Sequence, residues 1–134
     1  MERLSIILDT SAYSGFLRGQ AELKPIIEKA DKILFNPIIL GELLAGFVMG
    51  KNAPANRAYL DRFLASPRTG VVAIDGETSE RYAAIIRYLR LQGTPVPTND
   101  IWIAASAMQF GLKVVTRDAH FLKIPQILVE FITP

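Results

Sequence analysis

The sequence contains no cysteine and only one histidine, His120, among its 134 residues. Without thiols the chain has no disulfide framework, no thiolate zinc site and no cysteine nucleophile. With a single imidazole available, a metal bound by this protein is expected to be held by oxygen ligands, which suit hard divalent cations. The lack of cysteine also fits a reducing compartment, so we expect a cytoplasmic protein.

The sequence also lacks a hydrophobic run long enough to cross a bilayer, and its N-terminal segment does not resemble a signal peptide. The longest apolar stretch covers residues 38–49 and carries Glu42 near its centre. Neither sign of charge dominates, because fifteen basic residues stand against thirteen acidic ones, for a net charge of +2. We therefore expect a soluble protein without membrane contact, whose modest basic bias is compatible with a polyanionic partner.

Short β-branched runs alternate along the chain with longer segments of helical periodicity. This alternation is typical of α/β proteins with a mainly parallel sheet. At this length we expect one domain, a three-layer α/β/α sandwich around a central, mainly parallel five-stranded sheet. The strands are predicted at residues 4–8, 32–35, 71–74, 113–116 and 127–131, and the helices at residues 11–18, 22–30, 38–49, 54–65, 78–91 and 99–110.

Four acidic residues stand alone in apolar or small-residue surroundings: Asp9, Glu42, Asp100 and Asp118. Asp9 and Asp118 each follow a predicted strand. Glu42 lies one turn into the helix after the second strand, and Asp100 opens the helix that leads to the fourth. Open α/β sheets bind ligands at the carboxyl ends of their strands, so all four acids can reach one pocket if the first and fourth strands are neighbours.

Each acid also has a purely structural interpretation. Asp9 could cap the following helix, Asp100 would interact favourably with a helix dipole, and Asp118 could shape a turn. Glu42 is the hardest to explain in this way, because its helical neighbours are apolar. The order and context of all four acids together favour a shared metal site over four separate structural roles.

Carboxylates gathered in one pocket repel each other unless they are protonated or a cation neutralises them. Mg²⁺ or Mn²⁺ is the expected ion, since both prefer oxygen ligands. Such an ion lowers the pKa of a bound water and offsets charge on a phosphodiester. The pattern therefore predicts hydrolysis of a nucleic-acid backbone. Arg117, next to Asp118, could hold a phosphate or balance the charge of Asp118.

The chain resembles the PIN-domain ribonucleases, and within them the VapC-type toxins of type II toxin–antitoxin pairs. The resemblance covers residues 1–134 as a single PIN domain and rests on four segments in order: residues 7–12 (ILDTSA), 41–46 (GELLAG), 99–105 (NDIWIAA) and 115–121 (VTRDAHF). It implies a set of acidic residues that bind metal and catalyse the reaction, and small hydroxyl residues that line the site and contact the substrate. The implied acids are Asp9, Glu42, Asp100 and Asp118, and the implied hydroxyl residues are Thr10, Ser11 and Thr116.

The same resemblance implies an activity and partners. The activity is Mg²⁺- or Mn²⁺-dependent endonucleolytic hydrolysis of RNA, with tRNA or rRNA as the usual substrate of the toxin branch. The partners are a co-encoded antitoxin protein that blocks the site and a second copy of the chain in a homodimer. Apolar surface on two predicted helices is a candidate for these contacts, including Phe47, Val48, Met49, Tyr59 and Phe63.

Two other functions compete with this interpretation. A receiver-type phosphorylation switch is also a small α/β protein that binds magnesium, and Asp75 follows the third predicted strand as a phosphoacceptor would. However, Asp9 has no second acid beside it, and the fifth predicted strand is not followed by lysine. A non-catalytic interaction module on the same fold would use the apolar surface but would leave the four acids unexplained.

Overall fold

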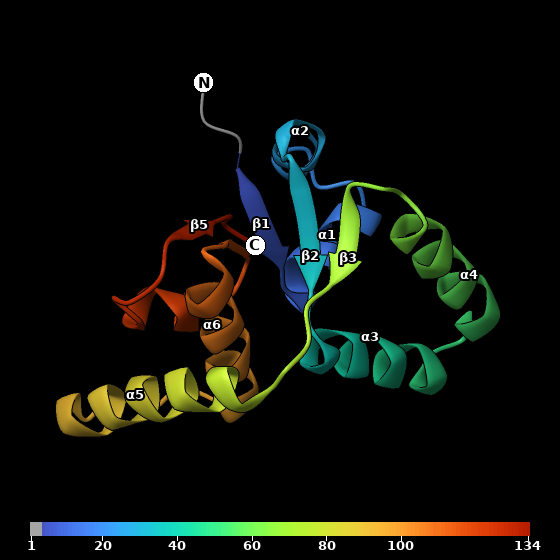
Figure 1. Ribbon diagram of the computed structural model, residues 1–134. Helices are drawn as coiled ribbons and strands as arrows, with labels where there is room; N and C mark the ends of the chain where they lie inside the picture. Colours follow the sequence, from blue (N-terminus) through green and yellow to red (C-terminus); the bar gives the residue numbers. More distant parts are fainter. Residues whose placement is uncertain (1–3) are drawn as a thin grey trace.

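A parallel five-stranded sheet forms the centre of the computed structural model, which describes residues 4–134 (Figure 1). The strands lie in the order β3-β2-β1-β4-β5. The first and fourth strands, β1 and β4, are neighbours, as a pocket shared by the four acids requires, and they pair in parallel with Ile7 opposite Val114. The strands are β1 (Ser5–Leu8), β2 (Lys32–Phe35), β3 (Thr69–Val71), β4 (Lys113–Thr116) and β5 (Val129–Phe131).

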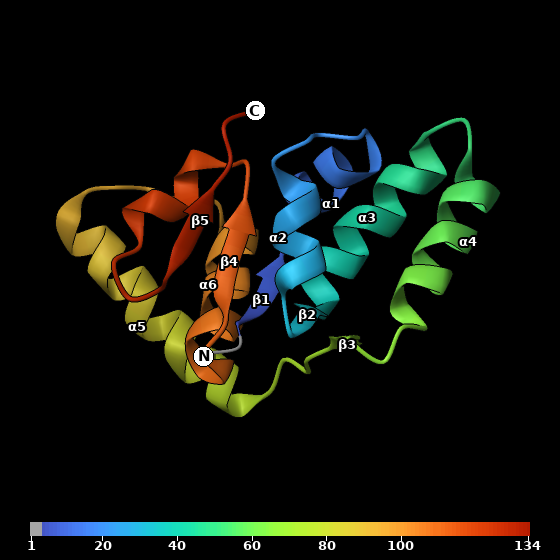
Figure 2. The ribbon, with the colours of Figure 1, turned by 90° about the horizontal axis from the view of Figure 1, so that it is seen from above.

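Helices cover both faces of the sheet. The connections from β1 to β2 and from β2 to β3 step along the sheet in one direction, whereas the connection from β3 to β4 steps back. Because such crossovers are right-handed, α1 to α4 lie on one face, and α5 and α6 lie on the other. Figures 1 and 2 show α4 and α5 at opposite ends of the molecule. The helices are α1 (Thr10–Leu17), α2 (Leu23–Lys29), α3 (Pro37–Met49), α4 (Ala53–Leu64), α5 (Gly76–Gln92), α6 (Thr98–Phe110) and the 3-10 helix η1 (Ala119–Lys123).

The predicted α/β/α sandwich with its five-stranded sheet is confirmed. Strand β1 begins one residue later than predicted and β5 two residues later, and β3 differs most in position. A strand was predicted at residues 71–74, whereas β3 covers Thr69–Val71. Its neighbour β2 ends at Phe35, because Asn36 and Pro37 begin α3. The last backbone bond joins the Val72 N–H to the Phe35 carbonyl, 2.8 Å away. Beyond this bond the neighbouring chain enters α3 at Pro37, so the segment after β3 has no strand partner there and leaves the sheet toward α5.

The core lies on both sides of the central strands. Ile7, Leu8, Val114 and Val115 are completely buried, as expected for a parallel sheet covered on both faces. An aromatic cluster forms beneath α4, where Phe63 packs edge-on against Tyr13, Phe35 and Phe16. Phe63 therefore belongs to the core side of α4 and not to the predicted apolar surface. In the described part of the chain, no helix is long and apolar enough to cross a membrane.

Candidate active site

The four isolated acids line one hollow of about 330 Å³ at the carboxyl ends of β1 and β4. Asp9 directly follows β1, and Asp118 lies two residues beyond β4. The connections from these two neighbouring strands leave toward opposite faces of the sheet, which opens a crevice between them. Glu42 reaches the hollow from α3, and Asp100 reaches it from the first turn of α6.

Asp9 is the most buried of the four carboxylates, with 4% of its surface exposed. It accepts hydrogen bonds from Thr116 Oγ1 at 2.6 Å, Ser11 Oγ at 2.8 Å and the Ala12 N–H at 2.8 Å. The bond from Ala12 caps α1, so the structural interpretation of Asp9 as a helix cap is correct. Burial raises the pKa of Asp9 above its ordinary value, although these hydrogen bonds oppose the shift.

Asp100 and Asp118 lie close together with His120 between them. The His120 Nδ1 atom is 3.2 Å from Asp100 Oδ2 and 3.0 Å from Asp118 Oδ1. The pKa of Asp100 is raised to about 6, chiefly by burial and also by the charge of Asp118, while the hydrogen bond from His120 opposes the shift. The ionised form of Asp100 is therefore destabilised by burial and by the neighbouring charge of Asp118.

Glu42 is held from two sides. Thr10 Oγ1 donates to Glu42 Oε1 at 2.7 Å, and Asn99 Nδ2 donates to Glu42 Oε2 at 3.3 Å. One donor belongs to α1 and the other to α6, so the side chain of Glu42 is fixed across the space between these helices. Asn99 opens the segment of residues 99–105 on which the family resemblance rests, but the sequence analysis gave it no role toward Glu42.

The predicted hydroxyl residues all contact the acids. Thr10 donates to Glu42, whereas Ser11 and Thr116 donate to Asp9. Ser11 Oγ also accepts from the Arg117 N–H, and Thr116 Oγ1 accepts from the Asp118 N–H, each at 2.9 Å. These bonds orient the carboxylates. Direct contact of the three hydroxyls with substrate stays a prediction.

Thr116→Val tests this orienting role, because valine keeps the shape of the side chain and removes its hydroxyl. Thr116 is completely buried, so the Asp118 N–H loses its partner and Asp9 loses its shortest hydrogen bond. We expect metal affinity and RNA cleavage to fall by about 10- to 100-fold, the usual effect of removing a group that orients a metal ligand. Calorimetric titration with Mn²⁺ measures the first effect. Thr116→Ser keeps the hydroxyl and serves as control; equal behaviour of the two variants would contradict the assigned role.

The donors around the hollow fit a hard divalent cation. Asp100, Asp118 and His120 each offer a ligand atom, and these atoms lie within 4.8 Å of one another. Asp118 also raises the pKa of Asp9, so Asp9 lies within electrostatic reach of the same cluster. Carboxylate oxygens are the ligands that Mg²⁺ and Mn²⁺ prefer, and a cation would relieve their mutual repulsion. The acidic cluster is compatible with the use of a divalent metal.

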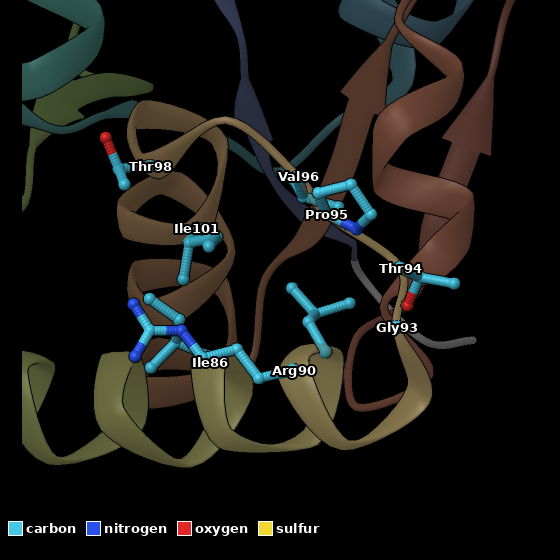
Figure 3. Close-up of a pocket in the computed structure, with 9 residues that line it drawn as sticks. Ile86, Arg90, Gly93, Thr94, Pro95, Val96, Thr98 and Ile101 are labelled. Carbon is cyan, nitrogen blue, oxygen red and sulfur yellow. The ribbon is translucent and has the colours of Figure 1, made fainter.

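A second, apolar hollow of about 440 Å³ lies between α5 and α6 (Figure 3). Ile86 and Arg90 of α5 and Ile101 of α6 line it, together with the loop that contains Pro95 and Val96. Its lining, as described within residues 4–134, contains no carboxylate. This hollow therefore lacks the groups that phosphodiester hydrolysis needs, and the acidic hollow is the candidate active site.

A parallel α/β sandwich with carboxylates gathered at the carboxyl edge of its sheet is the arrangement of a PIN-type nuclease. The chain belongs to this family, because the PIN domain model matches residues 6–127. The chain is 32% identical to "Ribonuclease VapC4" of Mycobacterium tuberculosis over 92 residues, which cover 69% of this chain and 71% of that protein. The predicted family resemblance is confirmed.

Two solved structures show the same fold over nearly the whole chain. One is VapBC2 from Rickettsia felis bound to a DNA fragment from their promoter, with a TM-score of 0.85 at 23% identity; the match covers 96% of this chain and 99% of that one. The other is DNA-bound VapBC from Salmonella typhimurium, with a TM-score of 0.81 at 27% identity over 96% and 98% of the two chains. The family match also excludes the receiver-type alternative.

Proposed function

We propose that the chain is an Mg²⁺- or Mn²⁺-dependent endoribonuclease whose catalytic and metal-binding residues are Asp9, Glu42, Asp100 and Asp118. Its family and its ribonuclease relative make it an endoribonuclease of the VapC class. The observation that carries the site assignment is the convergence of four carboxylates, from four separate segments of the chain, on one hollow. A non-catalytic module would have no use for this arrangement.

The residues of the chain prepare the site for a cation and a phosphodiester. A divalent ion held there would supply an activated water and offset the negative charge that builds on the phosphate. Ser11 and Thr116 orient Asp9, and Thr10 and Asn99 orient Glu42. Asp100, with a pKa of about 6, is mostly ionised at pH 7 and is then ready to bind metal.

Removal of metal tests the proposed chemistry. We expect the wild-type protein to cut single-stranded RNA in the presence of Mg²⁺ or Mn²⁺, to lose all activity in excess EDTA, and to regain it when either ion is restored. Separation of the RNA products on a denaturing gel measures the cleavage. Cleavage that persists after exhaustive chelation, or RNA left intact with both ions present, would contradict the proposal.

The proposed biological role is that of the toxin in a toxin–antitoxin pair, with tRNA or rRNA as substrate. The structural neighbours are VapBC assemblies, which supports an antitoxin protein as partner. The hairpin of α3 and α4 exposes Val48 by 75% and Met49 by 86%, as a contact surface for an antitoxin or a second copy would. We also propose a homodimer; a strict monomer in sedimentation at high concentration would contradict it.

A further inference from the structure

Arg18 and Arg117 form the boundary between the acidic hollow and a second polar hollow of about 570 Å³. Of the residues described as lining the two hollows, these arginines alone line both. Arg18 follows the last turn of α1, and Arg117 lies between Thr116 and Asp118. The second hollow extends from the arginines along the loop after α1, past Gln20, to Thr133.

The position of Arg117 is fixed by packing. Its N–H donates to Ser11 Oγ at 2.9 Å, which ties its backbone to the residue that orients Asp9. Its side chain passes over Gly15, where an added Cβ would lie only 2.7 Å from Arg117 Cδ. A glycine is therefore needed at this point for the close approach of the arginine.

The charges of both arginines have no counter-ion among the residues that the structure describes. Within residues 4–134 neither side chain forms an ion pair, and Arg117 Nε is buried without a hydrogen-bond partner. The nearby Gln20 Oε1 is likewise buried and unpaired. Among the described residues, none accepts a hydrogen bond from either guanidinium group, so their exposed donors are available to an anionic ligand.

The acidic hollow needs positive charge at its rim if its substrate is RNA. Four carboxylates repel a polyanion, and a bound cation offsets only part of this charge. Arg18 and Arg117 stand at the boundary between the acidic hollow and the second polar hollow. Glu22 is the one acidic side chain described in the lining of that space.

We propose that Arg18 and Arg117 bind the phosphate next to the one that is cut, and that the adjoining nucleotide of a single-stranded RNA occupies the second hollow. Guanidinium groups suit this task because they present several donors to phosphate oxygens. This inference rests on the proposed ribonuclease function. It adds the path by which the RNA strand leaves the acidic hollow.

A binding experiment in a cleavage-deficient background tests the arginines. Asp100→Asn serves as the parent, and Arg18→Gln, Arg117→Gln and the double substitution are added to it, since glutamine keeps much of the packing and removes the charge. Fluorescence anisotropy with a labelled single-stranded RNA in Mg²⁺ measures affinity over a range of salt. We expect at least a tenfold loss of affinity in the double variant, and a salt slope lower by about 0.7 for each phosphate that the protein no longer neutralises.

Arg87→Gln, an exposed arginine of α5, is the matched control, and thermal melting shows that each variant is folded. An equal loss in Arg87→Gln would show a general attraction of charge and would overturn the proposal. A second arm uses RNAs in which a single linkage is an uncharged methylphosphonate. In the parent, we expect a methylphosphonate at one linkage beside the cut site to lower the affinity for RNA. In the double variant, the same linkage should cause no further loss of affinity. If the methylphosphonate lowered the affinity of the double variant as much as that of the parent, the proposal would also be overturned.

Cleavage by the otherwise wild-type protein separates this inference from the function on which it rests. We expect Arg18→Gln and Arg117→Gln to raise KM at nearly unchanged kcat, because contacts made equally in the ground and transition states affect binding alone. Wild-type cleavage together with an unchanged KM in the double variant would overturn the arginine subsite alone. If the wild-type protein fails to cut RNA with either ion, the ribonuclease proposal and the subsite fail together.

Discussion

Asp100→Asn is expected to lower the rate of RNA cleavage by at least about 100-fold, the loss typical of removing one group that stabilises transition-state charge. Asparagine keeps the size of the side chain and removes one charge from the centre of the acidic cluster, next to Asp118 and His120. We expect the affinity for Mn²⁺ to fall as well, and growth arrest on expression to be relieved. Asp9→Asn should act in the same way.

The control for Asp100→Asn is Asp61→Asn on α4, which removes a carboxylate from an exposed pair with Arg57. Such surface pairs contribute little to stability, so cleavage and metal binding should match the wild type. The measurements are single-turnover cleavage rates with Mg²⁺ and Mn²⁺ and calorimetric titration with Mn²⁺. Wild-type cleavage by Asp100→Asn would remove Asp100 from the proposed catalytic group.

The same substitution is expected to stabilise the metal-free protein at neutral pH. The pKa of Asp100 rises from 3.8 to about 6 on folding, so the folded protein holds a proton that the unfolded chain releases. Stability from this group is therefore fully present below pH 3.8 and is lost as the pH rises through 6. Urea unfolding in EDTA should show that the free energy of unfolding of Asp100→Asn rises relative to that of the wild type as the pH increases from 3.8 to 6. A difference between the two proteins that does not change with pH would contradict the raised pKa.

The sequence carries enough information to predict the fold class and the gathering of the four acids. In a parallel sheet the carboxyl ends of all strands meet at one edge, so residues that follow β1 and β4 must lie near each other once these strands pair. Asp9 and Asp118 are placed by this rule alone. Glu42 and Asp100 needed the family resemblance as well, because the packing of α3 and α6 at that edge does not follow from helical periodicity.

The hydrogen bonds that orient the acids could not be predicted in this way. Thr116 lies 107 residues from Asp9, and Asn99 lies 57 residues from Glu42. Such partners depend on side-chain positions that are set only after the helices dock on the sheet. The position of β3 depends in the same way on the end of its neighbour β2 at Phe35. Local strand propensity predicts the third strand at residues 71–74 instead, because propensity takes no account of where the neighbouring strand ends.

Structural and functional interpretations of one residue are not exclusive in this site. Asp9 caps α1 through the Ala12 N–H and lines the acidic hollow as well. Asp118 similarly accepts from the His120 N–H at the start of η1 while its carboxylate lies beside Asp100. A cap fixes the direction of a carboxylate, and this is also what a metal ligand requires. The local roles therefore support the proposed site.

Among the residues that the sequence analysis did not single out, Asn36 has the largest expected effect on stability. It is completely buried at the end of β2. Its Oδ1 atom accepts from the Ile39 N–H at 3.0 Å and caps α3, and its Nδ2 donates to Ser106 Oγ at 3.0 Å and to the Trp102 carbonyl at 3.4 Å. This one amide thus links α3, which carries Glu42, to α6, which carries Asp100. The dipeptide Asn36-Pro37 indicates a helix start, but it does not indicate the contact with α6.

Asn36→Ala is expected to lower the free energy of unfolding by about 2–3 kcal/mol, because it removes a helix cap worth about 1 kcal/mol and leaves buried polar groups unpaired. Asn52→Ala is the matched control: Asn52 occupies the same position before α4 but forms no side-chain capping bond, so its loss should be nearly neutral. Urea unfolding of both variants in EDTA measures the difference. Cleavage should also fall in Asn36→Ala at temperatures where it stays folded, because Glu42 and Asp100 lose the link between their helices. Equal unfolding midpoints for the two variants would show that α3 and α6 are held together without this amide.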